Sequence, residues 1–148
     1  MIKIVIFLLF LAALHAKLEL MIEGKKDGWA VKLPCWRINN KLTQLCLGKE
    51  ITGYHVWMLT MYILIFHSPY LFIPISIKTE LYILGWFCWY WIAEDWFWFL
   101  ENNLYGFRNF KPGRIFWHKR WIWFLPVSYA WGIIIGTVLL LIGKHLHG

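Results

Sequence analysis

The sequence predicts an all-α integral membrane protein, a small bundle of about four transmembrane helices with a basic, aromatic-rich cytoplasmic side. First, the 148 residues are 60% hydrophobic and only 16% charged, whereas a soluble domain carries roughly 25% charged residues. Second, the chain has 12 Trp, a residue that concentrates at membrane interfaces. Third, its apolar runs are continuous rather than alternating, which favours helices over a transmembrane β-barrel.

Four apolar segments within a single membrane domain, residues 1–148, approach the length of about 20 residues that a membrane crossing needs. They lie at about residues 2–20, 54–74, 81–100 and 121–142. The third reaches this length only by including Glu94 and Asp95. The first has a short basic start and also suits a signal peptide, so a cleaved leader and a true span both remain open at this point.

Most of the 15 Lys and Arg residues lie in two long loops, at about residues 21–53 and 101–120. The positive-inside rule therefore places both loops in the cytoplasm and both termini outside, in the plasma (inner) membrane. It also argues against cleavage of the first segment, because a signal peptide would export a basic loop. Within the first loop, a short hairpin and a surface helix both fit the pattern of turn-forming residues.

The stretch "IAEDWFWFLENNLYGF" places adjacent carboxylates, Glu94 and Asp95, in the third apolar segment. A carboxylate in hydrocarbon costs about 2.5–3.5 kcal/mol on insertion scales, so it must face protein, water or a cation. Glu101 lies seven residues later on the same helical face. We treat Glu94, Asp95 and Glu101 as candidate catalytic residues. The alternative is structural, with the carboxylates paired to the basic loops.

Two histidines are expected on the same side of the membrane as these carboxylates. His55 begins the second segment and His118 precedes the fourth. With Glu94 and Asp95 they form a plausible ligand set for a divalent metal ion, which is the candidate cofactor. The spacing matches no recognised metal motif, and interfacial histidines bonded to backbone or lipid phosphate are the alternative.

Cations alternate with aromatic residues in the loops, a pattern that anionic lipid surfaces favour. The candidate lipid-binding residues are Arg37, Arg108, Arg114, Trp117, Lys119 and Arg120. A plain interfacial belt would look the same. Contact between the basic loops and anionic lipid explains the net charge of +7. Because the sequence has no recognised nucleic-acid-binding motif, we expect no nucleic-acid partner.

Two further features bear on function. His67 lies too far along its segment to join the cytoplasmic residues; it can stabilise a kink beside Pro69 or relay protons with Glu94. Gly132 and Gly136 form a GxxxG pattern that permits close helix packing, either within the chain or with a second copy or another membrane subunit.

No P-loop, serine-hydrolase, dinucleotide-binding or zinc-protease motif is present, and the three Cys form no CxxC pair. The leading hypothesis is a cytoplasm-facing carboxylate and histidine site that binds a polar or anionic lipid-like molecule, with a divalent metal ion and acid–base chemistry. One alternative is a non-catalytic subunit or assembly factor of a membrane complex; another is an oligomeric proton or ion pathway. The sequence alone does not decide whether the protein is an enzyme, nor its substrate.

Overall fold

The computed structural model describes residues 2–26, 28–46 and 49–146. Four long helices dominate the chain, as predicted: α1 (Ile2–Glu23), α3 (Gly53–His67), α4 (Ile77–Glu101) and α5 (Val127–His145). Ser76 caps α4 by accepting a hydrogen bond from the Thr79 N–H, and Thr52 caps α3 in the same way through the His55 N–H. Such caps satisfy donors that the first helical turn leaves without a partner.

The remaining elements are short. In the first loop, β1 (Arg37–Ile38) and β2 (Ile51–Thr52) pair antiparallel on either side of α2 (Lys41–Cys46). The turn signals at Gly24 and Gly28, where the sequence suggested a hairpin, lie in a stretch whose described residues form turns and no strand. In the second loop, the 3₁₀ helix η2 (Phe107–Asn109) precedes the antiparallel pair β3 (Trp121–Ile122) and β4 (Leu125–Pro126). A further 3₁₀ helix, η1 (Ser68–Leu71), follows α3.

Within the described residues, two helices are long and apolar enough to cross a membrane, α1 and α5, rather than the four predicted from sequence. α3 has only 15 residues, because it ends at His67 where Pro69 begins a 3₁₀ turn. α4 has 25 residues, but Glu94 and Asp95 interrupt its apolar sequence, and Lys78, Glu80 and Glu101 lie near its ends. The two helices therefore differ from a standard span in length or in polarity.

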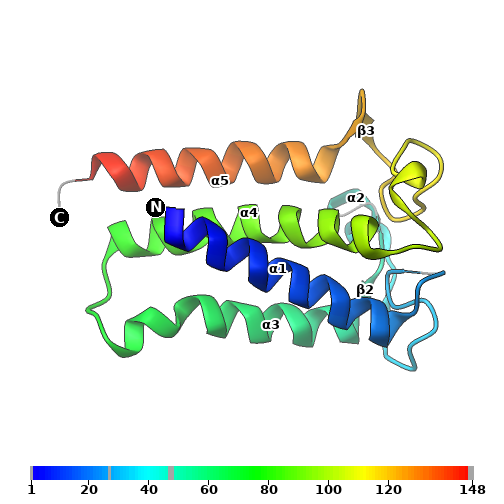
Figure 1. The fold of residues 1–148 in the computed structure, drawn as a ribbon, viewed down its shortest axis with the longest axis horizontal. Coiled ribbons are helices and arrows are strands. Elements are labelled where there is room, and N and C mark those ends of the chain that lie inside the picture. Colours follow the sequence, from blue (N-terminus) through cyan, green and yellow to red (C-terminus); the bar gives the residue numbers. More distant parts are fainter. Residues whose placement is uncertain (1, 27, 47–48, 147–148) are drawn as a thin grey trace.

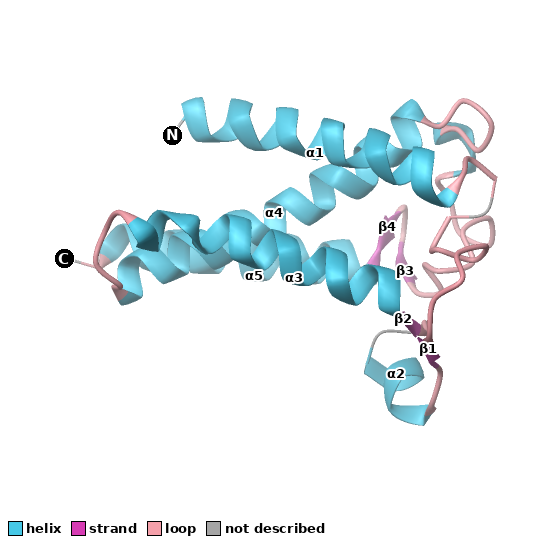
Figure 2. Cartoon of the chain, turned by 90° about the horizontal axis from the view of Figure 1, so that it is seen from below, coloured by secondary structure: helices cyan, strands magenta, loops and turns pink. Residues whose placement is uncertain are grey.

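The four long helices lie roughly along one direction, with both termini at one end and both long loops at the other (Figure 1). α4 is the central helix and packs most extensively against α1 and α5. Seen from below, α1 lies apart from the other helices at its N-terminal end, and α2 projects with the β1–β2 hairpin (Figure 2). This arrangement places the polar end of α4 beside both loops.

The contact between α4 and α5 depends on glycines. A Cβ atom on Gly136 would lie 2.9 Å from the Cβ of Cys88, and one on Gly132 would lie 2.9 Å from Cδ1 of Ile92. On the α4 side, a Cβ on Gly85 would lie 2.8 Å from Cγ of Leu140. The GxxxG pattern of α5 thus serves close packing within the chain, as small residues do between membrane helices.

Candidate functional site

One face of α1 carries three polar residues at intervals of four: His15, Glu19 and Glu23. Side chains four residues apart lie above one another on a helix. All three are buried, with 2%, 7% and 5% of their surface exposed. A helix that is otherwise strongly apolar therefore directs a polar stripe into the protein, where each of these groups needs a partner.

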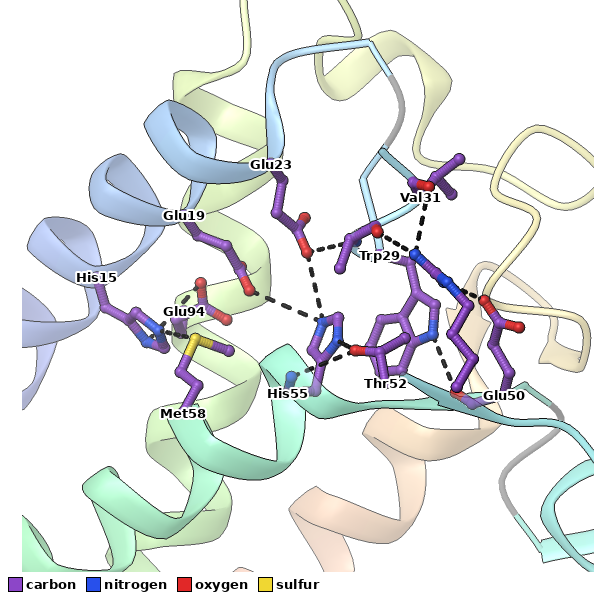
Figure 3. A network of polar contacts seen from close by, with 12 residues as sticks. His15, Glu19, Glu23, Trp29, Val31, Glu50, Thr52, His55, Met58 and Glu94 are labelled. Carbon is purple, nitrogen blue, oxygen red and sulfur yellow. Dashed lines mark hydrogen bonds and ion pairs between the residues drawn. The ribbon is translucent and has the colours of Figure 1, made fainter. Parts of the chain in front are cut away.

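Residues of α3 and α4 meet this stripe (Figure 3). His55 Nε2 lies 3.9 Å from Glu19 Oε1 and 3.5 Å from Glu23 Oε1. Glu94, which is 3% exposed, places Oε1 at 4.0 Å from His15 Nδ1. We call these five residues, His15, Glu19, Glu23, His55 and Glu94, the carboxylate–histidine cluster.

The His55 ring is held in a defined orientation. Its Nδ1 lies 2.6 Å from the Thr52 hydroxyl, and the Trp29 ring stacks on it with centroids 3.8 Å apart. The opposite nitrogen, Nε2, is thereby directed at Glu19 and Glu23. A histidine whose one nitrogen is fixed by a hydrogen bond presents the other one as a metal ligand.

His15 and Glu23 are also held by neighbours. The His15 ring nitrogens contact the Met58 sulfur and the Tyr90 hydroxyl, each at 2.9 Å. Glu23 Oε1 accepts a hydrogen bond of 2.5 Å from the Ala30 N–H. By contrast, the buried Oε1 of Glu94 has no hydrogen-bond partner among the described residues, although the Glu94 and Glu19 carboxyl groups are close enough to share a hydrogen bond; an unpaired buried oxygen is costly for a carboxylate.

The cluster contains two overlapping groups with the spacing of metal ligands. One comprises His15, Glu19 and Glu94 and the other Glu19, Glu23 and His55; in each, one ligand atom per residue lies within 4.8 Å of the others. Imidazole nitrogens and carboxylate oxygens suit divalent transition-metal ions. Glu19 belongs to both groups.

Asp95 has different partners from its neighbour Glu94. Its Oδ2 lies 2.9 Å from Nε2 of His118 and accepts a hydrogen bond from the Tyr129 hydroxyl. A carboxylate in this position fixes the orientation of the imidazole ring. Asp95, His118 and Tyr129 therefore form a hydrogen-bonded group suited to acid–base chemistry.

A cavity of about 420 Å³ connects the two sets of residues, a volume in the range typical of small-molecule sites. Its polar wall contains Glu19, Glu23, His55, Glu94, Asp95 and His118. Its apolar wall comes from α3, α4 and α5 and consists of Leu59, Phe87, Cys88, Trp91, Ile92 and Gly132. The indole N–H groups of two lining residues, Trp91 and Trp98, have no acceptor within the described chain.

Lys49, in the loop before β2, also lines this cavity. Its ammonium nitrogen lies 3.3 Å from the centroid of the Trp29 ring, a cation–π contact. Burial lowers the pKa of Lys49 from 10.5 to about 8, while the charges of Asp95, Glu19, Glu23 and Glu94 oppose this shift. Lys49 is thus a cation close to a group of carboxylates.

Of the residues singled out from sequence, His55, Glu94, Asp95 and His118 line one cavity. Glu101 is not among its lining residues and instead lies 3.7 Å from Lys17 Nζ. His67 is bonded to the Ile63 carbonyl at 2.7 Å and to Glu80 at 3.1 Å. Its contacts are therefore at the end of α3 opposite to His55.

The candidate lipid-binding residues have varied environments. Arg37 pairs with Glu50 and donates to the carbonyls of Ala30 and Val31, so it holds the first loop together. Trp117 is buried in an aromatic core and lines the cavity. The other four lie exposed in the second loop: Arg108, Arg114, Lys119 and Arg120.

The sequence-based candidates do not include His15, Glu19, Glu23 or Lys49. A signal for three of them exists in the sequence, because His15, Glu19 and Glu23 recur every four residues in an apolar helix. Lys49 has no such signal, since it lies among other loop lysines and reaches the cavity only through the fold.

No protein-family model matches the chain, and neither does any curated protein or solved structure.

Proposed function

We propose that this chain is a four-helix membrane protein whose carboxylate–histidine cluster binds a divalent metal ion beside a pocket for a lipid-like molecule. The observation that carries the proposal is the environment of Glu94. Its Oε1 is buried without a hydrogen-bond partner among the described residues, 4.0 Å from His15. A cation would supply the interaction that this oxygen needs.

The shape and chemistry of the cavity support a lipid-like ligand. Carboxylates, histidines and Lys49 lie toward the loops, whereas Leu59, Phe87 and Ile92 provide an apolar wall between the helices. A molecule with a polar head and a hydrocarbon tail matches both parts. Trp91 and Trp98 carry indole N–H donors that can serve head-group oxygens.

The group formed by Asp95, His118 and Tyr129 supports acid–base chemistry on a bound molecule. Asp95 fixes His118 at 2.9 Å, and both line the same cavity as the cluster. In this proposal, a metal ion held by the carboxylate–histidine cluster would supply Lewis-acid polarisation of the head group, and His118 gives or takes a proton. The arginines of the second loop contact lipid head groups.

The membrane topology is part of the proposal. α1 and α5 have the length and apolarity of spans, and α3 and α4 cross between them as an antiparallel pair. Both basic loops lie at one end (Figure 1), which the positive-inside rule assigns to the cytoplasm of the plasma (inner) membrane. The site would then open toward the cytoplasmic side.

Metal content tests the proposal directly. Wild-type protein in mild detergent, incubated with Mn²⁺ or Zn²⁺ and then desalted, should retain metal, and Glu94→Gln should retain at least tenfold less under matched conditions. Glu101→Gln is the matched control, because this residue of α4 pairs with Lys17 outside the cavity; it should retain metal as the wild type does. A folded wild type that holds no metal would refute the site.

Mass spectrometry of co-purified lipid tests the second part of the proposal, the pocket for a lipid-like molecule. A specific lipid should accompany the wild type and be depleted in Leu59→Trp, a change that puts a larger side chain into the apolar wall of the cavity on α3, away from the glycines of the α4–α5 contact. Lipids that merely reflect the bulk membrane in both proteins would contradict a defined pocket.

A further inference from the structure

We infer that the carboxylate–histidine cluster holds two divalent cations bridged by Glu19, and that this ion pair captures an anionic head group, with phosphate chemistry as the best match. The inference rests on the proposed metal site and specifies its stoichiometry and the class of its ligand.

The ligands divide evenly between two positions. His15 and Glu94 lie on one side of Glu19, and Glu23 and His55 lie on the other (Figure 3). Each position therefore has one imidazole and one carboxylate nearby, together with a share of Glu19, and in the first position His15 Nδ1 would exchange its contact with the Tyr90 hydroxyl for the ion. A single ion with metal–ligand distances of about 2.0–2.2 Å binds ligand atoms at most about 4.4 Å apart, so two separate groups of ligands suit two ions.

The two groups overlap in the way that a bridging carboxylate requires. Each has its ligand atoms within 4.8 Å of one another, so small side-chain rotations would bring them to bonding distance. Glu19 has two oxygens, one for each ion. Carboxylate-bridged ions in two-metal sites lie about 3.5–4 Å apart.

Charge gives an independent argument. With Glu19, Glu23, Glu94 and Asp95 ionised and Lys49 protonated, these cavity-lining groups carry a formal charge of −3. One divalent ion reduces this to −1, which still repels an anion, whereas two ions give +1. In this formal count, filling both positions favours an anionic head group more than filling one does.

The surroundings of the cavity also suit a phosphate group bound to both ions. A phosphate has more acceptor oxygens than two metal ions use, and the remaining oxygens need donors. Lys49 and the indole N–H groups of Trp91 and Trp98 are cavity residues that offer them. Two-metal sites act on phosphate esters by stabilising both the attacking and the leaving oxygen.

The test is Mn²⁺ stoichiometry combined with electron paramagnetic resonance on the full-length chain in detergent. Chelator-treated wild type, reloaded with Mn²⁺, should bind two ions per chain with the spectrum of an exchange-coupled pair. Glu23→Gln removes a ligand of one position only and should bind one uncoupled ion. Glu101→Gln should behave as the wild type.

The outcomes separate this inference from the proposed function. One uncoupled ion per wild-type chain would overturn the ion pair and leave the metal site intact. No bound ion in folded wild type would overturn both.

Inorganic phosphate is the probe for the ligand class. It should alter the Mn²⁺ spectrum of wild type and Glu101→Gln but not that of Glu23→Gln, which has one ion instead of a pair and whose cavity-lining groups reach a formal charge of only zero. A spectrum of the coupled pair that phosphate does not change would overturn the anionic ligand.

Discussion

At the scale of single residues, Lys49 is a cation that lines the same cavity as the carboxylates Glu19, Glu23, Glu94 and Asp95. Its contact with Trp29 links it to His55, because the same indole ring stacks on that histidine. Any change of charge among the carboxylates should therefore change the electrostatic potential at the Lys49 ammonium.

We predict an unusual pH dependence from this residue. Its pKa is lowered to about 8 by burial, against 10.5 in the unfolded chain. Between these values the unfolded state binds more protons, so the stability contributed by this group rises with pH across the window and is constant below it. Thermal unfolding in detergent from pH 7.5 to 10.5 should show this rise in wild type.

The control is Lys49→Met, which keeps the apolar stem of the side chain and removes the titrating group. Its melting temperature should depend less steeply on pH in the same window. Equal pH profiles for the two proteins would show that Lys49 titrates normally.

Sequence reasoning could reach only part of the site at this scale. Glu94 and Asp95 were recognisable because two carboxylates in an apolar segment demand an explanation. Their different environments were not recognisable, because what distinguishes Asp95 from Glu94 is its contacts with His118 and Tyr129. Those contacts join residues that lie more than twenty positions apart.

At the scale of elements, the α4–α5 contact determines the shape of the cavity, because Gly132 forms part of its wall. Gly136 lies one turn further along α5, where a Cβ would be 2.9 Å from the Cys88 Cβ and 3.1 Å from the Gly85 carbonyl oxygen. The close approach of the two helices depends on the absence of a side chain at this point.

We therefore predict that Gly136→Ala destabilises the protein by about 1–3 kcal/mol, the usual cost of overpacking. Gly143→Ala, on the same helix, is the matched control. Its Cβ would lie no closer than 3.4 Å to any neighbour, so the helix-forming gain of roughly 0.5–1 kcal/mol should appear instead. Unfolding in denaturant would measure both; similar effects would contradict the packing argument.

The four long helices were predictable from apolar runs, but among the described residues only α1 and α5 have the length and composition of a membrane span. A hydropathy pattern does not show where a helix ends: Pro69 shortens α3. It also does not show that the buried polar stripe of α1 belongs to a site, because the site forms only where this stripe meets residues of α3 and α4.

At the scale of the whole molecule, both basic loops gather at one end and both termini at the other (Figure 1). This arrangement agrees with the loop charges from which the orientation was derived, and the orientation itself stays a prediction. The loops fold over the site, since the first supplies Lys49 and Trp29 and the second supplies His118.

Cysteine labelling in cells tests the orientation. In a chain whose native cysteines are replaced, Lys111→Cys and Lys144→Cys provide two matched probes, one in the second loop and one near the end of α5. A membrane-impermeant maleimide should label Lys144→Cys in intact cells and Lys111→Cys only after permeabilisation. The reverse pattern would invert the topology, and equal labelling would refute an odd number of crossings between them.

The cluster joins residues from distant parts of the chain, and this has a consequence for biosynthesis. α1 leaves the ribosome carrying His15, Glu19 and Glu23, but Glu94 follows only about 70–80 residues later, several seconds at ~5–20 residues per second. During that interval the polar stripe of α1 lacks the partner that α4 provides. The nascent chain is then most exposed to membrane quality control, and variants of Glu94 should be eliminated by proteolysis during synthesis more readily than variants of the loops.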